Sequence, residues 1–126
     1  RLSTGGIEEV LAEHPDVAEC AVIGTADDLK GEVPVGFVVL KAGVTREEHD
    51  IVRELVERVR HTIGAFACFR TALVVAALPK TRSGKILRST MKKIADGQPY
   101  TTPATIEDPA VLAAVGDRLR ETGLAR

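Results

Sequence analysis

The 126-residue sequence contains no tryptophan, one tyrosine and three phenylalanines. Proteins that bind single-stranded nucleic acid by base stacking need exposed aromatic side chains, so this composition argues against that class. The formal net charge of −1 excludes bulk cationic attraction to nucleic acid or to an anionic membrane. No apolar run approaches the ~20 residues of a membrane span. We therefore expect neither a nucleic-acid nor a membrane partner.

Cysteine is scarce too, with only Cys20 and Cys68. Two cysteines are too few for a disulfide scaffold, and no His/Cys cluster accompanies them, so we expect no metal site and a reducing compartment. Glu8, Glu9 and Glu13 interrupt any apolar stretch that could form a signal peptide. The predicted location is the cytoplasm, or the mitochondrial matrix if the source is eukaryotic. The sequence lacks an initial Met and enters a helical pattern within four residues, so we expect a piece of a larger protein.

Hydrophobic periodicity predicts one globular domain. Helical spacing covers residues 4–13, a stretch after residue 45 that ends at Gly64, and residues 86–96. Strands are expected at 17–23, 33–40 and 71–77, with a polar loop at 24–31 and a proline-containing arm at 98–109 before a terminal helix. The order α-β-β-α-β-α, plus the arm and helix, predicts an α/β (α+β) sandwich with helices on the faces of a short, about three-stranded sheet.

Local signals suggest where the helices begin. Thr4 is a candidate N-cap for the first helix. Thr45 and Glu48 have the spacing of a capping box for the second. Asp108 followed by Pro109 is typical of the first turn of a terminal helix.

Residues 80–93 concentrate positive charge and contain no acid. The six basic residues are Lys80, Arg82, Lys85, Arg88, Lys92 and Lys93. On spacing alone, a solvated cationic helix face is as good an interpretation as a binding site. Ser83-Gly84 favours a tight turn that would present Lys85 at its tip, where a cation suits a phosphate or carboxylate partner.

Other catalytic signatures do not fit. A P-loop would require a glycine at the position of Pro79 and a Ser or Thr at that of Ile86. The three histidines, His14, His49 and His61, have no Ser or Cys at a sequence spacing typical of a catalytic pair. We therefore expect all three histidines to lie on the surface.

Residues 79–86 (PKTRSGKI) resemble the C-terminal signature of acyl-CoA synthetases, members of the adenylate-forming superfamily. Residues 1–4 (RLST) with 7–8 (IE) resemble the motif just past that family's interdomain hinge, although Gly6 stands where many relatives have Glu. Residues 14–19, 28–31, 63–64 and 69–70 extend the likeness. The tail, at 98–100 (QPY) and 105–109 (TIEDP), is more similar to propionyl-CoA than to acetyl-CoA synthetases.

The resemblance implies an ATP-dependent, AMP-forming ligase acting on a small carboxylic acid. Such an enzyme makes an acyl-adenylate and then transfers the acyl group to CoA. Residues 1–97 would form the mobile C-terminal domain, and the arm and helix at 98–126 would pack on it. The N-terminal adenylation domain, outside this sequence, would hold most of the substrate pocket and the Mg²⁺, so this fragment alone should be inactive.

Three site residues follow from the resemblance. Lys85 would be the catalytic lysine of adenylation, acting as a cation that reduces repulsion between carboxylate and triphosphate. Arg60 would contact the CoA 3′-phosphate; a helix-end cation favoured by the dipole is an equal alternative. Arg1 would approach the nucleotide phosphates, or would simply be a frayed terminus. Two other functions stay open: a free-standing regulatory module whose 80–93 patch binds phosphate, and a purely structural domain.

Overall fold

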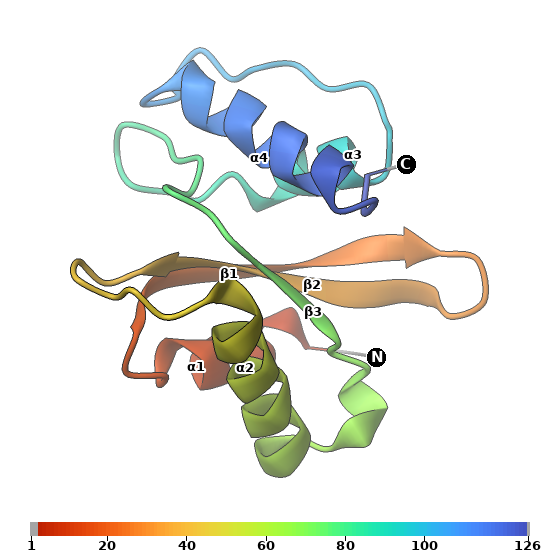
Figure 1. Ribbon diagram of the computed structural model, residues 1–126. Coiled ribbons are helices and arrows are strands. Elements are labelled where there is room, and N and C mark those ends of the chain that lie inside the picture. Colours follow the sequence, from red (N-terminus) through yellow and green to blue (C-terminus); the bar gives the residue numbers. More distant parts are fainter. Residues whose placement is uncertain (1–2, 126) are drawn as a thin grey trace.

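The computed structural model describes residues 3–125, in which a three-stranded sheet lies between two layers of helices (Figure 1). Helices α1 (Thr4–Ala12) and α2 (Glu48–Thr62) cover one face, and α3 (Arg88–Ala95) and α4 (Pro109–Glu121) cover the other. The strands are β1 (Val17–Asp27), β2 (Gly31–Leu40) and β3 (Thr71–Val74), and the short 3-10 helix η1 (Ala65–Ala67) precedes β3. The predicted fold class and element order are confirmed.

The sheet has the order β1-β2-β3, with an antiparallel β1–β2 hairpin and β3 parallel to β2. Because Thr71 pairs with Val35 and Val74 with Val38, β3 lies beside the second half of β2 and runs towards the end of the sheet where β1 starts. The expected loop at 24–31 is wrong in its first half: residues 24–27 continue β1 and pair with residues 31–34 of β2. The third strand is shorter than expected and ends at Val74.

Each face of the sheet buries its own core. Phe37 and Val35 of β2 pack with the α3–α4 layer, which includes Met91 and Leu119. Val38, on the opposite face of the same strand, packs with the α1–α2 layer. The expectation that this strand is covered on both sides is therefore confirmed, since successive side chains of a strand point to opposite faces.

Two of the predicted helix caps are wrong. Ser3, one residue earlier than Thr4, caps α1 by accepting a 3.3 Å hydrogen bond from the Gly6 amide. The capping box does not form, because the Glu48 carboxylate instead accepts a 2.7 Å hydrogen bond from the Val74 amide and pairs with Arg118. The start of α4 is as predicted: Asp108 accepts a 3.0 Å hydrogen bond from the Ala110 amide.

His14 is buried, at 2 % exposure, which corrects the expectation of a surface histidine. Its Nδ1 accepts a 3.0 Å hydrogen bond from the Asp16 amide, and its Nε2 lies 2.7 Å from Glu54 Oε1. Both ring nitrogens thus have partners, which is what allows a polar ring inside a protein. Hydrogen bonds from Arg46, and then from His14, lower the pKa of Glu54 to about 2.

A glutamate–arginine ion pair lies at each edge of the sheet. At the β1 edge, Glu8 of α1 accepts from the Val22 amide at 2.9 Å and pairs with Arg88 of α3. At the β3 edge, Glu48 of α2 accepts from the Val74 amide and pairs with Arg118 of α4. Each pair satisfies an edge amide, and each joins the two helix layers around the side of the sheet.

Among the described residues, no helix is both long and apolar enough to cross a lipid bilayer.

Candidate functional site

Lys85 lies on a tight loop closed by its own backbone. The Thr81 amide donates to the Lys85 carbonyl at 2.9 Å, and the Gly84 amide donates to the Thr81 carbonyl at 2.9 Å. The Thr81 hydroxyl accepts from the Lys85 amide at 3.1 Å. Gly84 adopts φ +93°, a left-handed conformation that glycine reaches without steric cost. The turn expected at Ser83-Gly84 is present.

The base of this loop is held from two sides. Lys80 and Ile86 form an antiparallel bridge, which pairs the two ends of the loop with each other. The C-terminal arm then packs alongside: the Arg82 amide donates to the Thr105 carbonyl at 3.0 Å, and the Glu107 amide donates to the Lys80 carbonyl at 2.8 Å. The loop is therefore braced by backbone hydrogen bonds rather than free to sample many conformations.

The Lys85 side chain is exposed and forms no ion pair with any acidic side chain in residues 3–125. It borders an open pocket of about 480 Å³ that is also lined by Thr81, Arg88, Ser89 and Thr105. A cation at a stiff tip without an internal counter-ion can be presented to an anion outside the domain.

The other basic residues of 80–93 do not form one open patch. Lys80 pairs with Glu19, Arg88 with Glu8, and Lys92 with Asp96. Lys92 also lies 3.0 Å from Glu32.

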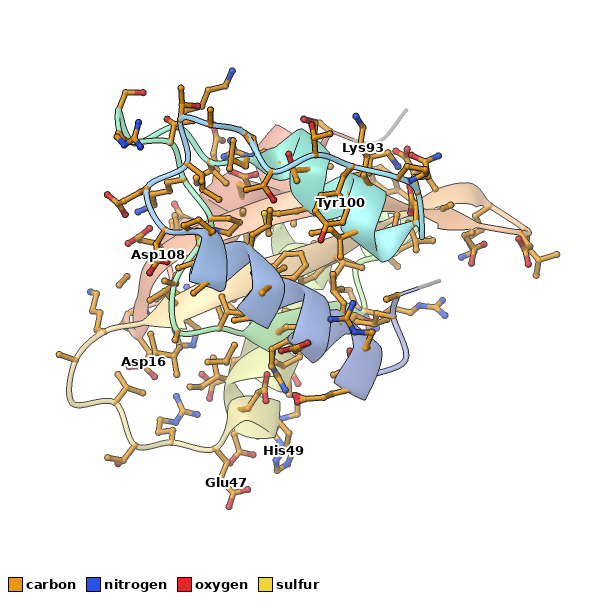
Figure 2. All side chains as sticks on the ribbon, turned by 90° about the horizontal axis from the view of Figure 1, so that it is seen from above. Asp16, Glu47, His49, Lys93, Tyr100 and Asp108 are labelled. Atoms are coloured by element: carbon orange, nitrogen blue, oxygen red, sulfur yellow. The ribbon has the colours of Figure 1, made fainter. Side chains whose placement is uncertain are left out.

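Among the described residues, three of the six cations have no ion pair: Arg82, Lys85 and Lys93. Lys93 lies on the exposed side of α3 (Figure 2). Half of the six cations are thus paired with acids in the fold, and of the others Arg82 and Lys85 lie on the loop.

Arg60 lies in the last turn of α2, exposed and without an ion pair among the described residues. It lines a small pocket of about 110 Å³ together with Gly64, Cys68 and Arg70. Two arginines bordering one concavity can attract a phosphate. Lys30, from the β1–β2 turn, adds a third cation nearby, because its Nζ is 3.1 Å from the Cys68 sulfur.

The structure does not bring Lys85 and Arg60 together. The Lys85 loop follows the end of β3, and its base pairs with Glu19 at the start of β1. Arg60 precedes η1 and β3 in the chain and shares a pocket with Cys68, whose sulfur contacts Lys30 of the β1–β2 turn. The two predicted site residues therefore face different surroundings. Arg1 lies outside the described residues.

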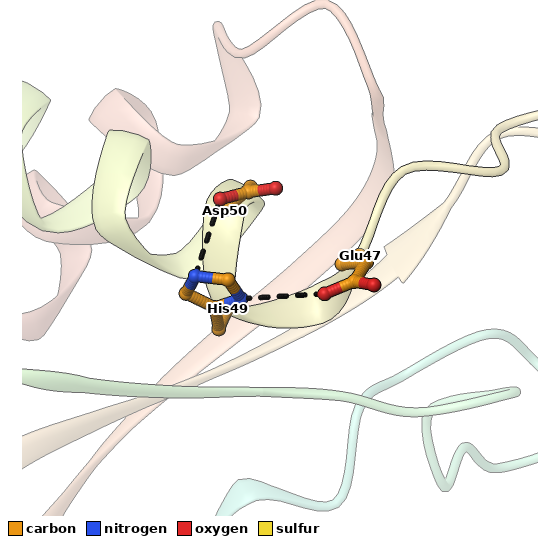
Figure 3. Close-up of side chains that lie close together, drawn as sticks. All are labelled: Glu47, His49 and Asp50. Carbon is orange, nitrogen blue, oxygen red and sulfur yellow. Dashed lines mark ion pairs between the residues drawn. The ribbon is translucent and has the colours of Figure 1, made fainter.

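One further cluster consists of Glu47, His49 and Asp50 at the start of α2 (Figures 2 and 3). His49 Nδ1 is 3.6 Å from Glu47, and its Nε2 is 3.3 Å from Asp50. Glu47 and His49 are exposed. Carboxylates at the start of a helix interact favourably with the helix dipole, so these acids need no bound metal ion to explain their position. The expectation that this chain supplies no metal ligand stays a prediction.

Sequence reasoning missed the partners that hold the Lys85 loop, Glu8 and Glu19. Both lie more than 60 positions before the cations they pair with, and an acid on an amphipathic helix or an edge strand gives no local signal of such a contact.

The family model for the AMP-binding enzyme C-terminal domain matches residues 6–85. The chain belongs to this family.

Its curated relatives include short-chain acyl-CoA synthetases. It is 51% identical over 91% of its length to the mitochondrial acyl-CoA synthetase short-chain family member B of Dictyostelium discoideum. It is 46% identical over 96% of its length to the mitochondrial short-chain family member 3 of Homo sapiens, and 49% identical over 86% to an acetyl-coenzyme A synthetase of Pyrobaculum aerophilum. It covers 17%, 18% and 16% of these proteins respectively, less than a fifth of each.

Among solved structures, the acyl-CoA synthetase of Brucella canis matches with a TM-score of 0.65 and 37% identity. The match covers 71% of this chain and 16% of that one. An acetoacetyl-CoA synthetase from Streptomyces lividans, 20% identical, shares the fold with a TM-score of 0.75 over 94% of this chain and 18% of that one.

Proposed function

We propose that this chain is the mobile C-terminal domain of an AMP-forming, short-chain acid–CoA ligase, with propionate as the preferred acid. The observation that carries the proposal is Lys85, an exposed lysine that forms no ion pair within residues 3–125 and lies at the tip of a braced loop. The larger adenylation domain is the partner, and the fragment by itself is inactive. The preference for propionate rests on the tail at 98–100 and 105–109, and relatives named as short-chain synthetases support the substrate class.

In the first step, a carboxylate oxygen of the acid bonds to the α-phosphorus of ATP and pyrophosphate leaves. Both reactants are anions and repel each other. The Lys85 ammonium would lie between them, where it lowers the repulsion and orients the attacking oxygen. It would serve as an electrostatic and orienting group, and takes no proton.

In the second step, the CoA thiol gives up its proton to solvent and its sulfur bonds to the acyl carbon, while the bond from that carbon to the phosphate oxygen breaks and AMP leaves. Arg60 would bind the 3′-phosphate of CoA, and Arg1 would approach the nucleotide phosphates. The base of the Lys85 loop is paired with Glu19 at the start of β1, whereas Arg60 shares a pocket with Cys68, whose sulfur contacts Lys30 of the β1–β2 turn. One fixed pose would therefore not bring both to a single cleft. This placement supports a domain that turns between the two steps.

Mg²⁺ would neutralise charge on the triphosphate. Residues 79–88, which form the loop and its base, contain no Asp or Glu. The ion would therefore be held by ATP and the adenylation domain.

The alternative of a free-standing phosphate-binding module has less support. Three of the six cations in its basic patch are paired with Glu8, Glu19 and Asp96, and the chain belongs to a family of enzyme C-terminal domains.

The test is Lys85→Ala in the full-length ligase, with each half-reaction assayed separately. Acyl-adenylate formation should fall by about 10² or more, as for other preorganised charge contacts, and the reaction of supplied acyl-adenylate with CoA should keep its rate. Arg82→Ala is the matched control, an exposed cation on the same loop. Equal loss in both half-reactions would contradict the proposed role.

Arg60 has a separate test. Arg60→Ala should raise the KM for CoA about tenfold, as expected for the loss of one charged hydrogen bond to phosphate. It should leave the KM for 3′-dephospho-CoA unchanged, and Arg58→Ala in the same helix is the control. An equal effect on both thiol substrates would favour the helix-end interpretation.

A further inference from the structure

We infer that Glu8 is a positioning residue for Lys85: through Arg88, it fixes the C-terminal base of the loop to the edge of the sheet. The inference rests on the proposed function and deepens it, because it names a residue remote in sequence on which adenylation should depend.

The contact is specific and multidentate. Glu8 Oε2 accepts hydrogen bonds from the Val22 amide at 2.9 Å and from Arg88 Nε at 2.8 Å, and its Oε1 accepts from Arg88 Nη2 at 2.7 Å. An arginine held by two parallel hydrogen bonds has a fixed direction as well as a fixed position. The Glu8 side chain is only 17 % exposed, so it has limited freedom to move.

Charge and burial agree with this role. Partial burial of Glu8 tends to raise its pKa, but hydrogen bonds from Arg88 and from the Val22 amide outweigh it, and the pKa lies below its ordinary value. Glu8 is therefore ionised throughout the neutral range, and its charge attraction to Arg88 is present there.

The position of Arg88 connects the pair to the catalytic group. Arg88 is the first residue of α3 and lies three residues after Lys85. Between them, the Leu87 amide donates to the Pro79 carbonyl at 2.9 Å, and Ile86 bridges to Lys80. A rotation of the first turn of α3 would therefore shift the loop as a unit. On the other side, Lys80 pairs with Glu19 of β1, so both ends of the loop are held by acids from the N-terminal part of the chain.

The β3 edge offers a matched control. Glu48 accepts from the Val74 amide and pairs with Arg118, whose Nε donates to the Val74 carbonyl at 3.2 Å. Here too an acid, an edge amide and an arginine join two helix layers. Arg118 belongs to α4, however, and is not part of the loop or its base. If the Glu8 pair merely stabilises the fold, Glu8→Gln and Glu48→Gln should have the same consequences for catalysis.

The experiment measures both half-reactions of the full-length ligase for Glu8→Gln, Glu48→Gln, Lys85→Ala and the double variant Glu8→Gln/Lys85→Ala. Because a shift of about 1 Å can cost on the order of 10²-fold in rate, Glu8→Gln should slow adenylate formation about tenfold or more. The reaction of supplied adenylate with CoA should change less than about twofold. Glu48→Gln should leave the ratio of the two rates as in the wild type.

The double variant decides whether Glu8 acts through Lys85. If it does, adding Glu8→Gln to Lys85→Ala should cause no further loss of adenylation, since coupled residues are not additive. Additive losses, or a Glu8→Gln enzyme with both half-reactions equally affected, would overturn the inference. Should Glu8→Gln fail to fold, Arg88→Gln breaks the same link while leaving Glu8 on the Val22 amide, and the same outcomes apply.

Failure of the inference differs from failure of the proposed function. If Lys85→Ala adenylates at the wild-type rate, the proposed function is wrong. If Lys85→Ala loses adenylation and Glu8→Gln and Arg88→Gln do not, only the positioning role is wrong.

Discussion

The conformation of Gly84 allows a sharp test of how the loop presents its lysine. Gly84 has φ +93°, and a Cβ built on it would meet nothing within 4 Å. The cost of Gly84→Ala is therefore conformational strain alone, about 1–2 kcal/mol for an L-residue with left-handed backbone. The loop can relieve that strain by unwinding, because its tip is exposed, and Lys85 would then leave its position.

We expect two measurable effects. The free energy of unfolding of the isolated domain in urea should fall by at most about 1–2 kcal/mol. Acyl-adenylate formation by the full-length enzyme should fall about tenfold or more. A lysine out of position raises the activation free energy, and each increase of about 1.4 kcal/mol lowers the rate tenfold. CoA acylation from supplied adenylate should stay unchanged.

Gly123 provides the control. It also has positive φ, +74°, with nothing within 4 Å of an added Cβ, but it follows α4 and lies outside the loop. Gly123→Ala should cost similar stability and leave adenylation intact. Wild-type adenylation by Gly84→Ala, or an equal loss in Gly123→Ala, would refute the idea that this turn positions the catalytic cation.

Three further predictions concern stability and reactivity. Because the pKa of Glu54 is lowered to about 2 by Arg46 and His14, the stabilisation from this carboxylate is complete above pH 4.5 and declines as the pH falls toward 2. The difference in unfolding free energy between wild type and Arg46→Ala should shrink over that range; a constant difference would contradict this. Burial, and then the charge of Glu8, raise the pKa of the Cys20 thiol from 9.0 to about 11. Iodoacetamide at pH 8 should therefore alkylate Cys20 about 100-fold more slowly in the folded protein than in the urea-unfolded protein. Mass spectrometry measures the two rates, and equal rates would exclude the shift. Phe37→Ala should destabilise the domain by about 3–5 kcal/mol in urea titrations, because the ring is fully buried; a loss under about 1 kcal/mol would contradict the core assignment.

Periodicity and turn residues were enough to predict the element order and the two-sided burial of β2, because both depend on local spacing. Helix caps and strand ends were less predictable, since they depend on partners elsewhere in the chain. Glu48 has the spacing of a capping box but binds Val74 and Arg118 instead. Residues 24–27 look like a polar loop, yet they are held in β1 by β2 and by the carboxylate of Asp96, 70 residues from Ala26.

In the candidate site, too, local sequence predicted some features, while others depend on distant partners. The motif at 79–86 indicated Lys85, and the turn residues indicated that it lies at a tip. Sequence alone could not show which neighbouring cations are neutralised, because Glu8 and Glu19 reach residues 80 and 88 only through the fold. That pairing reduces the six cations of residues 80–93 to three without an ion pair among the described residues, of which Lys85 is one.

The most direct measurement is the single-turnover rate of acyl-adenylate formation by the full-length enzyme carrying Lys85→Met. Methionine keeps most of the length and flexibility of lysine and removes its charge. If the ammonium acts as a cation in the first step, this rate should fall by about 10² or more, while CoA acylation from supplied adenylate proceeds as in the wild type. Adenylate formation at the wild-type rate by Lys85→Met would contradict the account.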